Sequence, residues 1–281
     1  MRIDAHAHVF PPGLASTGRG HYLELDLTYR TLYADPRAPL STAEALLDSM
    51  DQCGIDKTFL VNIGWATHEL CRETNDYILD AARRHPRRFV AFCSVNPLAG
   101  KEAVGEIERC AALGARGLGE LHPDSQGYDL ADPHVMGPIV QAAARRDMVI
   151  LTHASEPVGH LYPGKGQVTP RALYQFITNF PDQPIICAHW GGGLPFYALM
   201  PEVRRALKNV VFDTAASPFL YEPAVFETVA GLVGPEKILL GTDYPLIKQE
   251  RLLRQVQESS LSAQAQELVL GGNAARLLGL G

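Results

Sequence analysis

Two histidines separated by one residue, His6 and His8, stand in the segment Asp4-Ala-His-Ala-His8. Alternate residues of a strand point to the same face, so both imidazoles and the Asp4 carboxylate are expected on one face of a strand. Neutral imidazole is a common ligand for zinc, iron, nickel and copper, and catalytic zinc takes about three protein ligands and keeps an open position. The spacing therefore predicts half of a metal site.

Further metal-binding residue types stand where other apolar segments end. They are Glu120 and His122 in Gly117-Leu-Gly-Glu-Leu-His122, His153 in Ile150-Leu-Thr-His153, His189 in Ile185-Ile-Cys-Ala-His189, and Asp243 in Leu239-Leu-Gly-Thr-Asp243. A structural imidazole would explain one such histidine, but packing does not explain the repetition of the pattern along the chain. We therefore expect these side chains to meet in one place.

Eight short apolar segments alternate with helical patterns and must supply the scaffold. The expected strands are 3–8, 58–63, 89–96, 117–122, 148–153, 184–189, 210–214 and 238–243. They mostly lack polar alternation, which is typical of strands buried on both faces of a parallel sheet. We predict an α/β fold, a single-domain (β/α)8 TIM barrel over residues 1–281, whose strands all end at one mouth. A doubly wound open sheet is the alternative, but no glycine-rich phosphate loop follows the first strand.

Composition limits the partners. The chain has 281 residues, 46% hydrophobic and 20% charged, and a net charge of −6. The negative charge argues against a large nucleic-acid surface, and no apolar run is long enough for a membrane span. Five scattered cysteines and the lack of a signal-peptide pattern predict a reducing, cytoplasmic location. We expect a small-molecule substrate; a homo-oligomer is left open.

The motifs together resemble the amidohydrolase superfamily, in the branch that includes aminocarboxymuconate semialdehyde decarboxylase-like enzymes. The matching stretches are Asp4-Ala-His-Ala-His8, Thr152-His153, Ala188-His-Trp-Gly-Gly192, Gly241-Thr-Asp-Tyr-Pro245 and Gly272-Asn-Ala-Ala-Arg-Leu-Leu278. The resemblance spans the whole chain. It implies that His6, His8, His153 and Asp243 hold a divalent metal, and that His189 is a second-metal ligand or a proton-transfer residue.

The fourth expected strand departs from several superfamily members, because it has no lysine to bridge two metals. A glutamate can bridge instead, as in TatD-like nucleases, so we expect Glu120 to be a ligand or to contact one, and one or two ions remain open. Zinc is the first choice, with manganese, iron or cobalt as alternatives. His122 lies on the same expected face as Glu120 and is assigned to substrate binding. Asp4 is expected deeper than the ligands.

The first functional hypothesis is a metal-dependent hydrolase that cleaves an amide, lactone or ester through a metal-activated water. A divalent metal lowers the pKa of bound water from about 15.7 to about 7. Asp243 would take the proton of that water and pass it to the leaving group, and His189 would stabilise the developing oxyanion. Both residues are therefore predicted to be catalytic.

The alternative is a lyase of the same fold, a metal-dependent decarboxylase or hydratase. It would use the same ligands, with Arg30, Arg116 or Arg171 binding substrate carboxylates. A TatD-like nuclease is disfavoured by the charge. A histidinol-phosphatase-like enzyme is disfavoured because Tyr244-Pro245, and not a histidine, follows Asp243. A non-catalytic metal-binding protein would need no open coordination position.

Two long connections are expected over the mouth of the barrel, at residues 11–40 and 156–167. Long loops in a compact domain often serve as lids or binding loops. The loops after the first, second, fifth and eighth strands are expected to set specificity. The predicted substrate-binding residues are Trp65, His68, Trp190, Tyr244 and Arg30, together with His122, and Tyr162 is a further wall residue.

Overall fold

The computed structural model describes residues 1–280 and forms an eight-stranded parallel sheet in the order β1-β2-β3-β4-β5-β6-β7-β8. The strands are β1 Ile3–Ala7, β2 Lys57–Val61, β3 Phe89–Cys93, β4 Gly117–Leu121, β5 Val149–Thr152, β6 Ile185–Cys187, β7 Val210–Asp213 and β8 Ile238–Leu239. Backbone hydrogen bonds from Ala5 to Leu240 and from His8 to Tyr244, both 2.7 Å, join the last strand to the first. The (β/α)8 barrel predicted from the sequence is confirmed.

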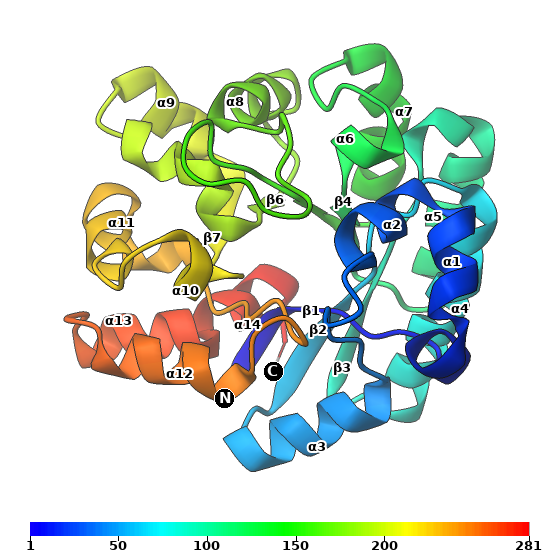
Figure 1. Cartoon of the computed structure of the whole chain (residues 1–281). Helices are drawn as coiled ribbons and strands as arrows, with labels where there is room; N and C mark the ends of the chain where they lie inside the picture. The colour runs from blue at the N-terminus through cyan, green and yellow to red at the C-terminus, as the bar shows by residue number, and fades with distance from the viewer. Residues whose placement is uncertain (281) are drawn as a thin grey trace.

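Helices surround the strands (Figure 1). They are α1 Arg19–Leu25, α2 Leu27–Tyr33, α3 Ala43–Cys53, α4 His68–Arg84, α5 Lys101–Ala112, α6 Pro123–Gln126, α7 Pro133–Ala144, α8 Pro170–Asn179, α9 Pro201–Ala206, α10 Ser217–Leu220, α11 Val225–Val233, α12 Gln249–Glu258, α13 Ala263–Glu267 and α14 Asn273–Leu278. None of the helices in the described residues has the length and apolar character needed to cross a membrane.

Local sequence signals explain where the helices begin and end. The Thr42 side chain accepts a hydrogen bond from the Ala45 amide and caps α3, and Gly54 ends that helix in the left-handed conformation at φ 66°. Asp132 caps α7 in the same way by accepting from the His134 amide. Capping satisfies backbone donors that have no partner inside the helix, so these residues fix the helix boundaries.

The strands carry one apolar layer inside the barrel and another toward the helices. Ile3 and Ala5 of β1 belong to the inner cluster with Phe59 and Phe92, whose rings stack at 5.2 Å. Ala7 belongs to the outer cluster that packs against the helices. Packing on both faces explains why the strands read as continuous apolar runs.

An irregularity in β1 corrects the expectation that Asp4 shares a face with the two histidines. The pairing register with β2 shifts between Asp4 and Ala7, so the simple alternation is broken. The Asp4 carboxylate instead accepts hydrogen bonds from Thr242 Oγ1 at 2.6 Å and from Gln249 Nε2 at 2.8 Å. Asp4 therefore joins β1 to the segment after β8 and does not point into the mouth with His6.

A second irregularity, in β4, brings Glu120 into the mouth. The register with β5 shifts between Leu118 and Leu121. Gly119 has φ +140°, and a Cβ atom there would lie 2.1 Å from the Leu151 carbonyl oxygen. Only glycine tolerates both this conformation and this approach. Gly119 is thus required by the backbone path that leads into Glu120.

The long connection after β1 contains helices α1 and α2, and not only an irregular loop. Asp26 caps α2 and also accepts hydrogen bonds from the Ala66 and Thr67 amides of the β2 connection. Thr28 of α2 donates a hydrogen bond to Ser125 of α6. These contacts hold the segment beside α6 (Figure 1). The connection therefore forms part of the wall around the mouth.

Candidate metal centre

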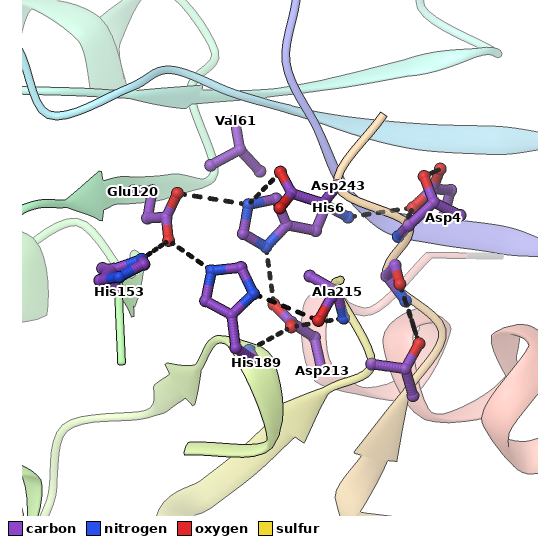
Figure 2. A network of polar contacts seen from close by, with 12 residues as sticks. Asp4, His6, Val61, Glu120, His153, His189, Asp213, Ala215 and Asp243 are labelled. Atoms are coloured by element: carbon purple, nitrogen blue, oxygen red, sulfur yellow. Dashed lines mark hydrogen bonds and ion pairs between the residues drawn. The ribbon is translucent and has the colours of Figure 1, made fainter. Parts of the chain in front are cut away.

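Seven buried side chains from the ends of five strands meet at the mouth of the barrel. They are His6 and His8 from β1, Glu120 and His122 from β4, His153 after β5, His189 after β6 and Asp243 after β8, and each is at most 9% exposed. Figure 2 shows His6, His153 and His189 around the Glu120 carboxylate. The convergence predicted from the sequence is therefore present in the fold.

Glu120 is the centre of this cluster. Its Oε2 lies 3.1 Å from His122 Nε2, 3.4 Å from His6 Nε2 and 3.6 Å from His8 Nε2. Its Oε1 lies 3.0 Å from His153 Nδ1 and 3.3 Å from His189 Nε2. One carboxylate thus faces five imidazoles. The ring of His122 also stacks on that of His153 at 4.6 Å, so His122 lies within the cluster and not only on its substrate side.

Buried oxygen atoms orient the two histidines of β1. His6 Nδ1 lies 2.8 Å from Asp213 Oδ2, and His8 Nδ1 lies 2.8 Å from the Val61 carbonyl oxygen. An Nδ1–H group donated to oxygen leaves the Nε2 lone pair free for a cation. Both Nε2 atoms face the cluster, and His8 Nε2 is 3.2 Å from Asp243 Oδ1. The ring orientation is therefore the one a metal ligand needs.

Asp213 is a site residue that the sequence reasoning missed. It ends β7 and is completely buried. One oxygen orients His6, and the other accepts hydrogen bonds from the backbone amides of His189, at 2.9 Å, and Ala215, at 3.0 Å. Its signal in the sequence is the same as that of Asp243, an acidic residue where the apolar segment Val210-Val-Phe ends.

A tight left-handed turn positions His189. His189 and Trp190 have φ values of 54° and 57°, and Gly191, Gly192 and Gly193 are also in the left-handed region. A Cβ atom at Gly192 would lie 2.3 Å from the Ser155 carbonyl oxygen, so the turn requires glycine there. His189 Nδ1 lies 3.2 Å from the Ala215 carbonyl oxygen, which can only accept a hydrogen bond. Nδ1 therefore carries a proton, and Nε2 faces Glu120.

Within the cluster, the pKa values of the two acids are lowered and that of His189 is raised. Burial alone would raise the pKa of Glu120, but the charge of His122 and its hydrogen bond outweigh burial and hold that pKa well below its usual value. The pKa of Asp243 is lowered despite burial, chiefly by the hydrogen bond from His8. Burial lowers the pKa of His189, but the hydrogen bond and charge of Glu120 oppose it and raise the pKa to about 9. Both acids are thus carboxylates near neutral pH.

The donor set fits a divalent cation. The ligand atoms of His6, His8 and Asp243 lie within 4.8 Å of one another, and so do those of Glu120, His122 and His153. Imidazole and carboxylate groups bind zinc, manganese, iron and cobalt. All predicted ligands except His189 fall in these two groups. Glu120 contacts histidines of both groups, and His189 lies outside them, 3.3 Å from Glu120 Oε1.

A cavity of about 510 Å³ opens onto the cluster. It reaches His8, Glu120, His122, His153, His189 and Asp243, and its walls include Leu32, Tyr33, Ala38, Pro39, Tyr162, Phe219, Leu220 and Leu246. The walls come from the connections after β1, β5, β7 and β8. From the sequence, the connections after β1, β5 and β8 are expected to set specificity, but the connection after β7 is not among them. The predicted connection after β2 does not line the cavity.

Several predicted substrate-binding residues do not line this cavity. Trp65 is fully buried, stacks on Tyr29 at 5.4 Å and donates its Nε1–H to Asn62. Trp190 is fully buried, because the left-handed turn directs its ring toward Phe226.

Tyr244, His68 and Arg30 do not line the cavity either. The Tyr244 hydroxyl accepts a hydrogen bond from Ser41 Oγ. The next two residues, Pro245 and Leu246, line the cavity in its place. His68 begins α4, and Arg30 is exposed on α2. The predicted wall residue Tyr162 does line the cavity.

The positive group at the cavity is Arg37, which the sequence reasoning did not select. Among the lining residues of the described chain it is the one lysine or arginine. Its guanidinium pairs with Asp35, with an Nη2–Oδ2 distance of 2.8 Å, and remains 89% exposed. The suggested Arg116 instead donates to the Leu278 carbonyl of α14, and Arg171 is exposed on α8. Neither lines the cavity.

Comparison with known proteins agrees with the fold and the motifs. The family model described as amidohydrolase matches residues 3–280, so the chain belongs to the amidohydrolase family. It is 23% identical, over all of its own length and 92% of the relative, to 2-amino-3-carboxymuconate-6-semialdehyde decarboxylase from Dictyostelium discoideum. The resemblance stated from the sequence is confirmed.

Solved structures with this fold include three decarboxylases. The chain superposes on 5-carboxyvanillate decarboxylase LigW from Sphingomonas paucimobilis with a TM-score of 0.81 at 19% identity, covering 100% of this chain and 99% of the other. It superposes on 2,6-dihydroxybenzoate decarboxylase, complexed with 2,6-dihydroxybenzoate, with a TM-score of 0.77 at 18% identity, covering 99% of each chain. The 5-carboxyvanillate decarboxylase of Novosphingobium aromaticivorans, with bound manganese, has a TM-score of 0.80 at 20% identity and covers 100% of this chain and 97% of the other.

Proposed function

We propose that this protein is a metal-dependent decarboxylase of a small carboxylated aromatic or unsaturated acid. The observation that carries the proposal is a cavity with apolar walls that opens onto the imidazole–carboxylate cluster and is also lined by the ion pair of Arg37 and Asp35. Apolar walls suit a planar hydrocarbon body, and the Arg37 guanidinium, whose Nε and Nη2 donate to Asp35, has Nη1 left to donate to a substrate carboxylate. The named relatives act as decarboxylases, which favours the lyase hypothesis over the hydrolase hypothesis.

His6, His8, His153 and Asp243 would hold the cation, with Glu120 beside them as a further ligand. When bound, a divalent cation supplies positive charge that polarises substrate oxygen atoms and withdraws electrons from the carbon skeleton. The manganese of the Novosphingobium enzyme makes manganese as strong a choice here as zinc. Asp243 is assigned the role of a ligand, because its lowered pKa keeps it ionised and makes it a poor proton donor.

His189 is the proposed proton donor. Its Nδ1–H is held by the Ala215 carbonyl oxygen, so Nε2 is the atom that exchanges a proton at the cavity. In decarboxylation the bond between the carboxylate carbon and the ring or chain breaks, carbon dioxide leaves, and the electron pair stays on the substrate carbon. A proton from His189 Nε2 then forms the new C–H bond. Such proton transfer contributes about 10²- to 10⁴-fold to rate.

The test uses full-length protein loaded with Mn²⁺ or Zn²⁺. Release of carbon dioxide would be measured with 5-carboxyvanillate, 2,6-dihydroxybenzoate and related acids, beside hydrolysis of esters and lactones of similar size. We expect carbon dioxide release that stops with a chelator, and a loss of about 10²-fold or more in His189→Asn with cation content unchanged. The exposed His134 of α7 gives the control His134→Asn. Hydrolysis without carbon dioxide release would instead support the hydrolase.

A further inference from the structure

We propose that the Ser155 hydroxyl sets the tautomer of His153 and joins this ligand to the connection that covers the cavity. Ser155 is completely buried two residues after His153. Its Oγ lies 3.3 Å from His153 Nε2, while His153 Nδ1 lies 3.0 Å from Glu120 Oε1. The two nitrogens of one imidazole thus face two different partners. The inference rests on the cation-binding part of the proposed function and adds a positioning residue to it.

The hydrogen-bond count explains why a hydroxyl is needed. A serine hydroxyl has one proton and two lone pairs. The backbone N–H of Gly166 donates to Ser155 Oγ at 3.0 Å and uses one lone pair. The hydroxyl can rotate, so either the remaining lone pair or the proton can be directed at His153 Nε2, 3.3 Å away. Ser155 can therefore donate to Nε2 when Nδ1–H is bonded to Glu120, and can accept from Nε2–H when Nδ1 is a ligand.

The same hydroxyl is attached to the segment 156–167. The Gln167 amide, next to Gly166, lies 2.9 Å from both carboxylate oxygens of Asp124 on α6. Within the segment, Lys165 Nζ donates to the His160 carbonyl at 2.9 Å. Because His160 and Tyr162 line the cavity, a substrate that contacts them also contacts the segment that holds Ser155. The chain of contacts therefore runs from the cavity wall through Gly166 and Ser155 to the His153 ring.

The Ser155 backbone is held independently of its hydroxyl. Its amide donates to the Val168 carbonyl at 2.9 Å, and Gly192 of the β6 turn packs against its carbonyl oxygen. Removal of the hydroxyl therefore leaves the backbone attached on both sides. This makes Ser155→Ala a clean test, and Ser155→Thr restores a hydroxyl at the same place.

The experiment measures Zn²⁺ binding without substrate, by competition with a chelating dye. We expect Ser155→Ala to weaken binding about 10- to 100-fold, and Ser155→Thr to stay within about threefold of wild type. The control is Ser259→Ala at the end of α12, which removes a hydroxyl that donates to the Val256 carbonyl and contacts no imidazole. With substrate, Ser155→Ala is expected to lower kcat at saturating Zn²⁺ more than it changes KM.

The wild-type protein supplies a second readout that needs no Ser155 variant. Long-range ¹H–¹⁵N spectra, with His153 assigned through His153→Asn, should show the Nδ1–H tautomer without Zn²⁺ and the Nε2–H tautomer with it. Equal Zn²⁺ affinity in Ser155→Ala and wild type, or one unchanged tautomer, would overturn this inference while leaving the proposed function standing. Failure of the wild type to bind either Zn²⁺ or Mn²⁺ would overturn both.

Discussion

Asp213 Oδ2 and His6 Nδ1 lie 2.8 Å apart in a place where neither side chain is exposed to solvent. The carboxylate fixes the ring of a predicted ligand and, through its second oxygen, the backbone of His189. Two residues that would perform different tasks, cation binding and proton donation, therefore depend on one acid. An acid buried in this way is stable only because several hydrogen bonds replace water.

Loss of the Asp213 carboxylate should weaken cation binding. We expect Asp213→Asn to lower Zn²⁺ or Mn²⁺ affinity about 10- to 100-fold, because the acceptor that orients His6 is lost. The measurement is titration against a chelating dye. Asp129→Asn is the control, since Asp129 bonds only to the backbone of an exposed turn. A cation affinity of Asp213→Asn equal to that of wild type would contradict the role of Asp213 in orienting His6.

Arg37 should affect substrate binding and should not affect cation binding. Arg37→Met is expected to raise KM for carboxylated acids about 10-fold or more, because a charge-assisted hydrogen bond to the substrate is lost. Arg30→Met, on the neighbouring helix α2 but outside the cavity, should leave KM unchanged. Steady-state kinetics of carbon dioxide release separate the two variants. A larger effect at Arg30 would restore the assignment made from the sequence.

Gly119 should tolerate no side chain. Gly119→Ala places a methyl group 2.1 Å from the Leu151 carbonyl oxygen at φ +140°. We expect a loss of about 2–4 kcal/mol in the free energy of unfolding, measured in denaturant. Gly105→Ala on α5 is the control, because a Cβ atom there meets nothing within 4 Å. That control should gain about 0.5–1 kcal/mol, and equal behaviour of the two variants would refute the steric argument.

The free energy of unfolding should fall in acid, because Glu106 becomes protonated there. Burial would raise the pKa of this carboxyl, but hydrogen bonds from Arg109, at 2.7 and 2.8 Å, and from Asn75 outweigh burial and lower it. A pKa lower in the folded state than in the unfolded chain, where glutamate titrates near about 4.3, means that the ionised form stabilises the fold above that pH. This contribution is lost as the pH falls through the folded-state pKa.

The Glu106 prediction is checked by measuring unfolding in denaturant between neutral pH and about pH 3. Glu106→Gln should be destabilised by about 1–3 kcal/mol at neutral pH and should lose part of the acid dependence. Glu108→Gln removes an exposed pair with Arg145 and should change little. An unaltered acid dependence in Glu106→Gln would contradict the assignment.

Cation binding should raise thermal stability, because a ligand that binds only the folded chain stabilises it by mass action. At a free cation concentration about 100 times Kd, the gain is about 2.7 kcal/mol. Calorimetry with and without Mn²⁺ should show the shift, and a chelator should reverse it. His6→Asn should lose most of the shift, and His134→Asn should keep it.

The sequence predicted the barrel because the buried strands are continuous apolar runs, and it predicted the convergence of ligands because parallel strands end at one mouth. It placed the strand ends up to four residues too late at β8, where polar residues leave the ladder to face the mouth. Strand alternation failed at Asp4, because the break in register depends on pairing with β2.

The cavity walls were harder to predict. A tryptophan in a connection looks the same in sequence whether it packs under a helix, as Trp65 does, or faces a ligand. Its direction depends on contacts between segments far apart in the chain. Arg37 was missed for the same reason, since its place at the cavity follows from how the segment after α2 folds back.

The proposed cation ligands stand at strand ends, whereas Leu32, Phe219 and Leu246 of the wall belong to separate connections. Replacements in these connections can accumulate over evolutionary time without disturbing the inner scaffold. A descendant of this protein could thus acquire a new substrate preference by drift in a few surface segments, while it inherits the same reactive centre unchanged.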